Sequence, residues 1–119
     1  MDPIPLLKEM VAIPSVNPMG RDLVGEEYYE TKLSDYFDAL FRRENIAFER
    51  VAVAPGRTNI LARCDSPGSE ITVLMDAHQD TVPVDGMVIP PYEPRVDGGK
   101  LYGRGSCDIK GGGAAMLDW

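Results

Sequence analysis

The segment of residues 71–83, which reads ITVLMDAHQDTVP, decides both the fold class and the place of the chemistry. Its first five residues are apolar or β-branched, which is typical of a strand buried on both faces of a parallel sheet. His78, the single histidine of the chain, follows this predicted strand at its carboxyl end. Because open α/β sheets bind ligands at the carboxyl ends of their strands, we expect a ligand site here.

His78 and Asp80 are two positions apart, so in extended backbone their side chains point the same way. A carboxylate beside a histidine can fix the imidazole tautomer and raise the basicity of the ring as a metal ligand. For this motif alone, a capped strand end with a solvated histidine and aspartate is the favoured interpretation, because histidine is often partly exposed without any ligand.

A second segment, GRGSCDIKGGG at residues 103–113, surrounds one aspartate with glycines. Glycine lets the backbone turn sharply and pack tightly around Asp108, and a following helix would favour a carboxylate at its N-terminus, where it can bridge cations. The segment lacks the Gly-Lys-Ser/Thr of a P-loop, and Asp108 stands where a dinucleotide fingerprint needs glycine. A flexible glycine-rich loop is an equally good interpretation of this segment alone.

Cys107 lies in the same segment and raises the question of a nucleophile. The only histidine already belongs to the first motif, and no pattern of oxyanion donors surrounds the thiol. A small residue that fills space is therefore the favoured interpretation of Cys107.

Two helices are predicted before these segments. Asp2 and Pro3 form a capping pair for a first helix, which Pro14 ends. Aromatic and leucine residues recur every three or four positions between about Gly25 and about Asn45. This spacing predicts a second helix whose apolar stripe packs in the core.

Strands and one further helix complete a predicted α/β chain. The predicted strands are residues 48–53, 59–63, 71–75, 95–96 and 100–102, of which the last two form a short hairpin. A third helix is predicted from near Ile109, with no stop signal before Trp119.

Composition and charge exclude several classes of protein. The chain has 119 residues, enough for one domain or a piece of a larger one. Its net charge of −7 disfavours nucleic-acid binding, which needs clustered lysine and arginine. The sequence has no apolar run of about 18 residues and no signal-peptide pattern. Cys64 and Cys107 are accordingly expected to be reduced thiols in a cytoplasmic chain.

Together the two segments resemble the first two signature blocks of the M20 family of metallopeptidases and deacylases. The first block, an apolar strand and then H-x-D-x-V-P, corresponds to Leu74–Pro83, and the second, Y-G-R-G-x-x-D-x-K-G-G, to Tyr102–Gly112. Residues 13–18 and 55–60 resemble earlier segments of the family, so the likeness covers the whole chain. Ala77 is a small departure, because the family commonly has glycine there.

The resemblance implies roles for three residues. His78 would be a ligand of one metal ion, and Asp80 would be the catalytic aspartate that orients His78. Asp108 would be the carboxylate that bridges two zinc ions, with Co²⁺ or Mn²⁺ as alternatives, and a cis peptide bond to Ile109 would follow it. Two metals about 3.5–4 Å apart polarise an amide carbonyl and lower the pKa of a bound water to about 7.

The resemblance also implies a fold and an activity. The fold would be the N-terminal part of a doubly wound, zinc-peptidase-like α/β catalytic domain with an incomplete sheet. The activity would be hydrolysis of the amide bond in N-acyl amino acids or small peptides, with acetylornithine deacetylase as the first comparison. Residues 1–119 would lack the family's lid or dimerisation domain and the C-terminal half that supplies the general-base glutamate and the other ligands.

Two hypotheses follow: an M20-type amidohydrolase represented by part of its chain, or a non-enzymatic or split-protein fragment that retains half of a metal site. One histidine and one carboxylate are fewer than the three protein ligands of a catalytic zinc, so the chain alone is expected to be inactive. An incomplete sheet has an exposed edge, so we expect self-association or pairing with the missing part. No nucleic-acid or membrane partner is expected.

Overall fold

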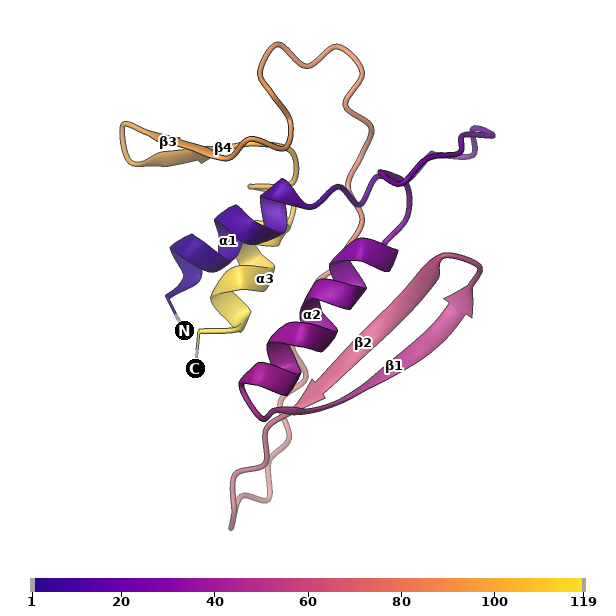
Figure 1. The fold of residues 1–119 in the computed structure, drawn as a ribbon. Coiled ribbons are helices and arrows are strands. Elements are labelled where there is room, and N and C mark those ends of the chain that lie inside the picture. The colour runs from indigo at the N-terminus through magenta and orange to yellow at the C-terminus, as the bar shows by residue number, and fades with distance from the viewer. Residues whose placement is uncertain (1, 119) are drawn as a thin grey trace.

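The computed structural model of the chain describes residues 2–118, and its helices and strands form the predicted α/β mix (Figure 1). The elements are α1 (Pro3–Ala12), α2 (Thr31–Arg43), β1 (Ala47–Ala54), β2 (Arg57–Arg63), β3 (Arg95–Asp97), β4 (Lys100–Tyr102) and α3 (Lys110–Met116). Helices α1 and α3 pack side by side, although they lie at opposite ends of the sequence, and α2 covers the hairpin of β1 and β2. Among the described residues, no helix is long and apolar enough to cross a membrane.

Helix α1 begins and ends as the sequence predicts. The Asp2 side chain accepts a hydrogen bond of 3.0 Å from the backbone N–H of Ile4, while Pro3 occupies the first turn. The helix stops before Pro14, and Ile13 has extended backbone with φ −97° and ψ 112°. This is the conformation that the proline ring imposes on the residue before it.

Helix α2 begins at Thr31, later than the predicted start near Gly25. The apolar spacing includes Tyr29, but the N–H of Tyr29 donates at 2.9 Å to the carbonyl of Val16 in a distant loop. Tyr29 also has φ 64°, a left-handed conformation that a right-handed helix cannot include. Pairing with Val16 therefore overrides the helical pattern. The predicted stop is confirmed, since Asn45 has φ 56° just after the helix.

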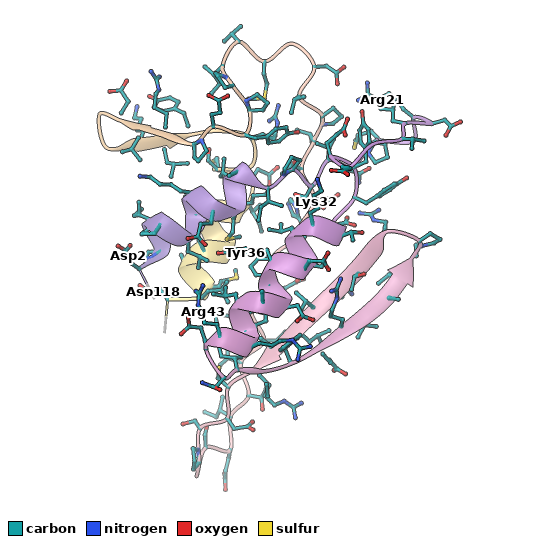
Figure 2. All side chains as sticks on the ribbon, in the orientation of Figure 1. Asp2, Arg21, Lys32, Tyr36, Arg43 and Asp118 are labelled. Carbon is teal, nitrogen blue, oxygen red and sulfur yellow. The ribbon has the colours of Figure 1, made fainter. Side chains whose placement is uncertain are left out.

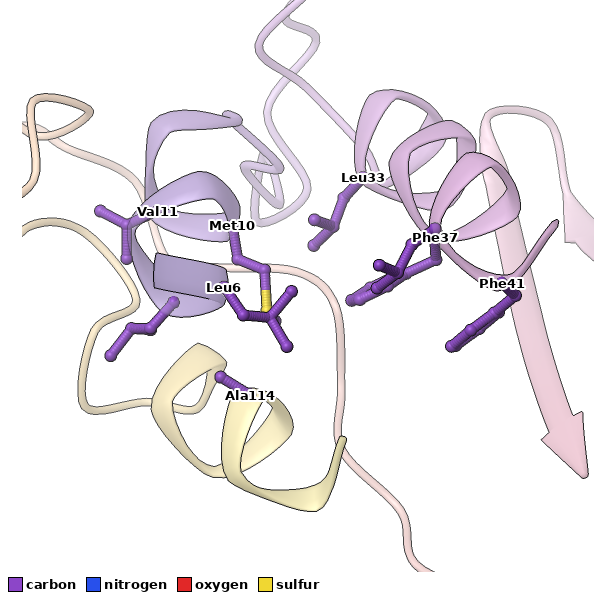
Figure 3. Packing of buried hydrophobic residues seen from close by; sticks show 9 residues of the cluster. Leu6, Met10, Val11, Leu33, Phe37, Phe41 and Ala114 are labelled. Carbon is purple, nitrogen blue, oxygen red and sulfur yellow. The ribbon is translucent and has the colours of Figure 1, made fainter. Parts of the chain in front are cut away.

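The apolar stripe of α2 forms part of the core, as predicted, and faces α1 and α3 (Figure 3). The buried residues of this cluster are Leu6, Leu7, Met10, Val11, Leu33, Phe37, Leu40, Phe41 and Ala114. Phe37 and Phe41 stack with their ring centroids 5.9 Å apart. Tyr36 points from α2 toward α1, where its hydroxyl donates to the Glu9 carboxylate at 2.7 Å (Figure 2). Burial of each large apolar side chain contributes roughly 1.5–3 kcal/mol.

The predicted hairpin is present, and the first two predicted strands also pair with each other. Strands β1 and β2 pair antiparallel and contain the runs predicted from residues 48–53 and 59–63. Strands β3 and β4 also pair antiparallel, with Asp97 opposite Lys100. Gly98 and Gly99 form the turn between them with φ 56° and 76°, values that a two-residue hairpin turn requires and that glycine adopts freely.

The predicted strand at residues 71–75 is wrong. The stretch has no regular structure, and Ile71 and Leu74 are 78% and 86% exposed. A strand needs a neighbour for its backbone hydrogen bonds, and the named strands of residues 2–118 pair only as β1 with β2 and β3 with β4. The apolar pattern suits a buried strand, but the described chain has no sheet that could cover it.

Helix α3 begins at Lys110, next to the predicted start near Ile109. It ends at Met116, and the N–H of Leu117 then donates at 3.2 Å to the carbonyl of Ala114. The helix therefore has a stop that the sequence pattern did not reveal. The predicted continuation of the helix through Leu117 and Asp118 is wrong, and Trp119 lies outside the described residues.

Candidate metal centre

Backbone hydrogen bonds with the loop that follows α1 hold the first motif, residues 74–83, in place. The N–H of Thr81 donates at 2.9 Å to the carbonyl of Ser15, and the N–H of Asn17 donates at 2.8 Å to the carbonyl of Thr81. The Ser15 hydroxyl donates at 2.7 Å to the carbonyl of Gln79. These bonds, and not a parallel sheet, hold the segment that carries His78.

The structure brings the three predicted site residues together around one imidazole ring. The Nδ1 atom of His78 lies 2.9 Å from the carbonyl oxygen of Asp80 and 3.3 Å from its carboxylate Oδ1. The Nε2 atom of His78 lies 3.1 Å from Oδ1 of Asp108. Asp108 is 75% exposed, so its carboxylate remains open to solvent and to a ligand. The roles of ligand, orienting group and bridge remain predictions for these three residues.

The surroundings of His78 raise the pKa of its ring. Partial burial lowers the pKa of His78, but the carbonyl of Asp80 and the carboxylate of Asp108 outweigh this effect. The net result is a pKa above the ordinary value of histidine. Since a metal binds only the neutral ring, metal binding here would compete with the proton.

Glycines let the loop before α3 approach the rest of the site closely. Gly105 has φ 83°, and a Cβ atom there would lie 2.8 Å from the Cγ2 atom of Thr81. A Cβ atom on Gly103 would lie 2.4 Å from a methyl group of Val11. The peptide bond between Asp108 and Ile109 is cis, as predicted.

A buried lysine fixes the other end of this loop. Lys110 is 2% exposed, and its Nζ atom donates at 2.9 Å to the carbonyl of Met10 and at 2.7 Å to the carbonyl of Ile13. Its backbone N–H donates at 2.9 Å to the carbonyl of Gly105. Burial lowers the pKa of Lys110 to about 8. The loop that carries Asp108 is thus tied to the C-terminal end of α1.

Three further residues contact Asp80 or its partner, and the sequence did not single them out. The Nδ2 atom of Asn17 donates to Oδ2 of Asp80 at 2.8 Å, and Nη2 of Arg57 lies 3.4 Å from the same oxygen. Arg57 also donates through Nε and Nη2 to the buried carboxylate of Glu30. Asn17 and Arg57 lie in the two upstream segments that carried the resemblance, which was the only signal for them.

The side chains at His78 and Asp108 suit a divalent metal in type, because imidazole nitrogen and carboxylate oxygen are common ligands of zinc. These two side chains are too few to complete a metal site. Within residues 2–118, no group of three or more His, Cys, Asp or Glu side chains converges to hold a metal ion. Cys107 is an exposed free thiol beside Asp108, and Cys64 is also free and exposed.

Comparison with known proteins agrees with the two sequence motifs. Residues 74–119 match the family model described as Peptidase family M20/M25/M40. The chain is 34% identical over 115 residues to the succinyl-diaminopimelate desuccinylase of Buchnera aphidicola subsp. Baizongia pistaciae, a match that covers 94% of this chain and 27% of that protein. It is 35% identical over 99 residues to a probable succinyl-diaminopimelate desuccinylase of Staphylococcus aureus, covering 81% of this chain and 24% of that protein.

These matches confirm the resemblance predicted from residues 74–83 and 102–112. The chain spans about a quarter of the length of the curated relatives that it matches. The second match shows that the similarity does not depend on a single relative.

Proposed function

We propose that this chain, as a member of the M20/M25/M40 peptidase family over residues 74–119, forms the N-terminal portion of a metal-dependent amide hydrolase. The observation that carries the proposal is the position of the His78 ring between Asp80 and Asp108, on the segment that matches the family. A solvated strand end, the plainer interpretation of the first motif, gives no reason for Asp108 to lie 3.1 Å from the ring.

In this proposal, each of the three residues has a separate task. Asp80 holds the Nδ1–H of His78 through its carbonyl and Oδ1 atoms, which leaves the Nε2 lone pair facing Asp108. His78 and Asp108 would hold divalent metal, with zinc as the first choice and Co²⁺ or Mn²⁺ as alternatives. When bound, a metal supplies Lewis-acid polarisation of an amide carbonyl and lowers the pKa of water to about 7.

The proposed substrates are N-acyl amino acids. Both relatives named above are desuccinylases, which favours a succinylated amino acid over the acetylated one that the motifs first indicated. N-acetylornithine therefore remains the alternative substrate, and small peptides remain a third class. Each of these substrates has an amide bond near a carboxylate, so the same hydrolytic site could act on all three.

The remaining parts of the site are proposed to come from chain beyond these residues. The relatives are about four times as long as the stretch matched here, which leaves room for a general base, further ligands and a lid or dimerisation domain. The exposed apolar residues 71–75 would then pair with that remainder or with another copy. The 119-residue chain alone is expected to hydrolyse no acyl-amino acid at a measurable rate.

The test compares the complete protein that contains this sequence with its His78→Ala variant. Metal content and hydrolysis of N-succinyl-diaminopimelate and N-acetylornithine are measured for both, with Asp65→Ala, an exposed carboxylate in the loop after β2, as the control. We expect zinc-dependent hydrolysis that His78→Ala abolishes and the control retains. Absence of both metal and hydrolysis in the complete protein would refute the proposal and favour the non-enzymatic alternative.

A further inference from the structure

The two oxygens of the Asp80 carboxylate have different partners. Oδ1 lies 3.3 Å from Nδ1 of His78. Oδ2 accepts from Nδ2 of Asn17 at 2.8 Å and lies 3.4 Å from Nη2 of Arg57. The carboxylate is therefore held on the side away from the histidine, by residues 63 and 23 positions earlier in the chain.

Other hydrogen bonds fix the orientation of both partners of Oδ2. The Oδ1 atom of Asn17 accepts from the N–H of Met19 at 2.9 Å, and this fixes the amide with its Nδ2 donor toward Asp80. Asn17 itself is anchored, because its N–H donates to the carbonyl of Thr81.

Arg57 is held by a buried carboxylate. Glu30 is 5% exposed and lies directly before α2, and Arg57 donates to it through both Nε and Nη2. A buried carboxylate needs a charged partner, so this pair is strongly oriented. The Nη2 atom of Arg57 contacts Glu30 and Asp80 together, which links α2, β2 and the first motif.

We propose that Asn17 and Arg57 are positioning residues that hold Asp80 so that it selects one tautomer of His78, with Glu30 fixing Arg57 in turn. The Nδ1–H tautomer donates to the backbone carbonyl of Asp80 at 2.9 Å, with the carboxylate Oδ1 3.3 Å away, and leaves Nε2 without a proton. The other tautomer places its proton on Nε2, where Asp108 is a ready acceptor 3.1 Å away, and that form cannot bind metal at Nε2. A carboxylate released from Asn17 and Arg57 no longer supports the Nδ1–H beside that carbonyl, so the balance shifts toward the tautomer that blocks ligation.

This inference rests on the proposed function only in the part that makes His78 a metal ligand. The tautomer itself is a property of the metal-free chain. It can be measured directly, because His78 is the only histidine and its ring signals need no assignment by mutation.

The experiment records the ring ¹⁵N chemical shifts of His78 in the metal-free 119-residue chain, at a pH where the ring is neutral. The variants are Asn17→Ala and Arg57→Gln, which remove the two donors to Oδ2 from different elements. The matched control is Arg50→Gln, which removes an arginine of β1 that pairs at 2.7 Å with Asp35 and does not contact Asp80. Backbone amide spectra report in the same samples whether each variant is folded.

We expect the wild type and Arg50→Gln to show mainly the Nδ1–H tautomer. Asn17→Ala and Arg57→Gln should each raise the Nε2–H fraction several-fold. If both variants keep the wild-type tautomer ratio, the residues serve only to join β2 and the early loop to α2, and the proposal is overturned. Should Arg57→Gln fail to fold, Asn17→Ala decides the question, because it removes only a half-exposed amide.

A second measurement separates this inference from the proposed function. Zinc affinity of the complete protein is compared for the wild type, Asn17→Ala and Arg50→Gln. A tautomer change without any zinc binding in the wild type would leave the positioning role intact and remove the proposed function. Zinc binding that Asn17→Ala leaves unchanged, together with an unchanged tautomer, would remove the positioning role and leave the proposed function.

Discussion

The Nζ atom of the buried Lys110 donates a hydrogen bond of 2.7 Å to the carbonyl of Ile13, across 97 positions of the sequence. The bond joins the first residue of α3 to the residue that follows α1. Because Asp108 lies two residues before Lys110, the same bond limits where the carboxylate of Asp108 can lie. The stability of α1 and α3 is therefore coupled to the geometry of the site.

Replacing Lys110 with methionine should destabilise the chain by about 1–3 kcal/mol, because the carbonyls of Met10 and Ile13 lose a buried donor. Urea unfolding followed by circular dichroism measures the change. Lys32→Met is the control, since Lys32 makes an exposed ion pair with Glu26 that contributes less than about 1 kcal/mol. Equal effects of the two substitutions would contradict the anchoring role of Lys110.

The same lysine predicts a pH dependence of stability. Burial lowers the pKa of Lys110 from 10.5 to about 8, so the folded chain releases this proton more readily than the unfolded chain. Between about pH 8 and about pH 10.5 the unfolded state binds more protons, and the free energy of unfolding should rise with pH, by at most roughly 3 kcal/mol. Lys110→Met should lack this rise, and comparing the two proteins cancels the titration of tyrosines and cysteines. A constant difference between them across this range would contradict the shift.

Two neighbouring glycines of α3 should respond in opposite directions to alanine. A Cβ atom on Gly111 would lie 2.5 Å from the backbone oxygen of Ser106, so Gly111→Ala should destabilise the chain by about 1–3 kcal/mol. A Cβ atom on Gly112 would have nothing within 4 Å, so Gly112→Ala should stabilise it by about 0.5–1 kcal/mol through helix propensity. Thermal unfolding of both variants is the measurement. The same sign for both would show that α3 does not pack against the Asp108 loop.

Local rules predicted the parts of this fold that depend on neighbours in sequence. The Asp2 cap, the apolar stripe of α2 and the Gly98–Gly99 turn each follow from a few adjacent residues. The pattern at residues 71–75 indicates a buried strand, but a strand also needs a partner, and no local signal reports whether one is present. Tyr29 fits the helical spacing, yet its pairing with Val16 decides its conformation.

The residues of the candidate site also fall into two groups, those that local motifs predict and those that depend on distant contacts. His78, Asp80 and Asp108 were predictable because two motifs with chemically specific spacing contain them. Asn17, Glu30 and Arg57 were not, because their contacts with Asp80 or with one another span 23 to 63 positions and follow from how α2, β2 and the early loop meet. No spacing rule relates an asparagine to an aspartate so far along the chain.

Replacing Asp80 with asparagine should weaken zinc binding by the complete protein by about 10–100-fold, because His78 loses the carboxylate that orients Nδ1. The carbonyl of Asp80 still accepts from the ring, so binding should be reduced and not abolished. Competition with a chromophoric chelator measures the affinity. Asp85→Asn is the control, since Asp85 pairs with Arg21 at the surface and does not contact the histidine. Equal zinc affinity of the two variants would mean that the Asp80 carboxylate does not orient His78 for the metal.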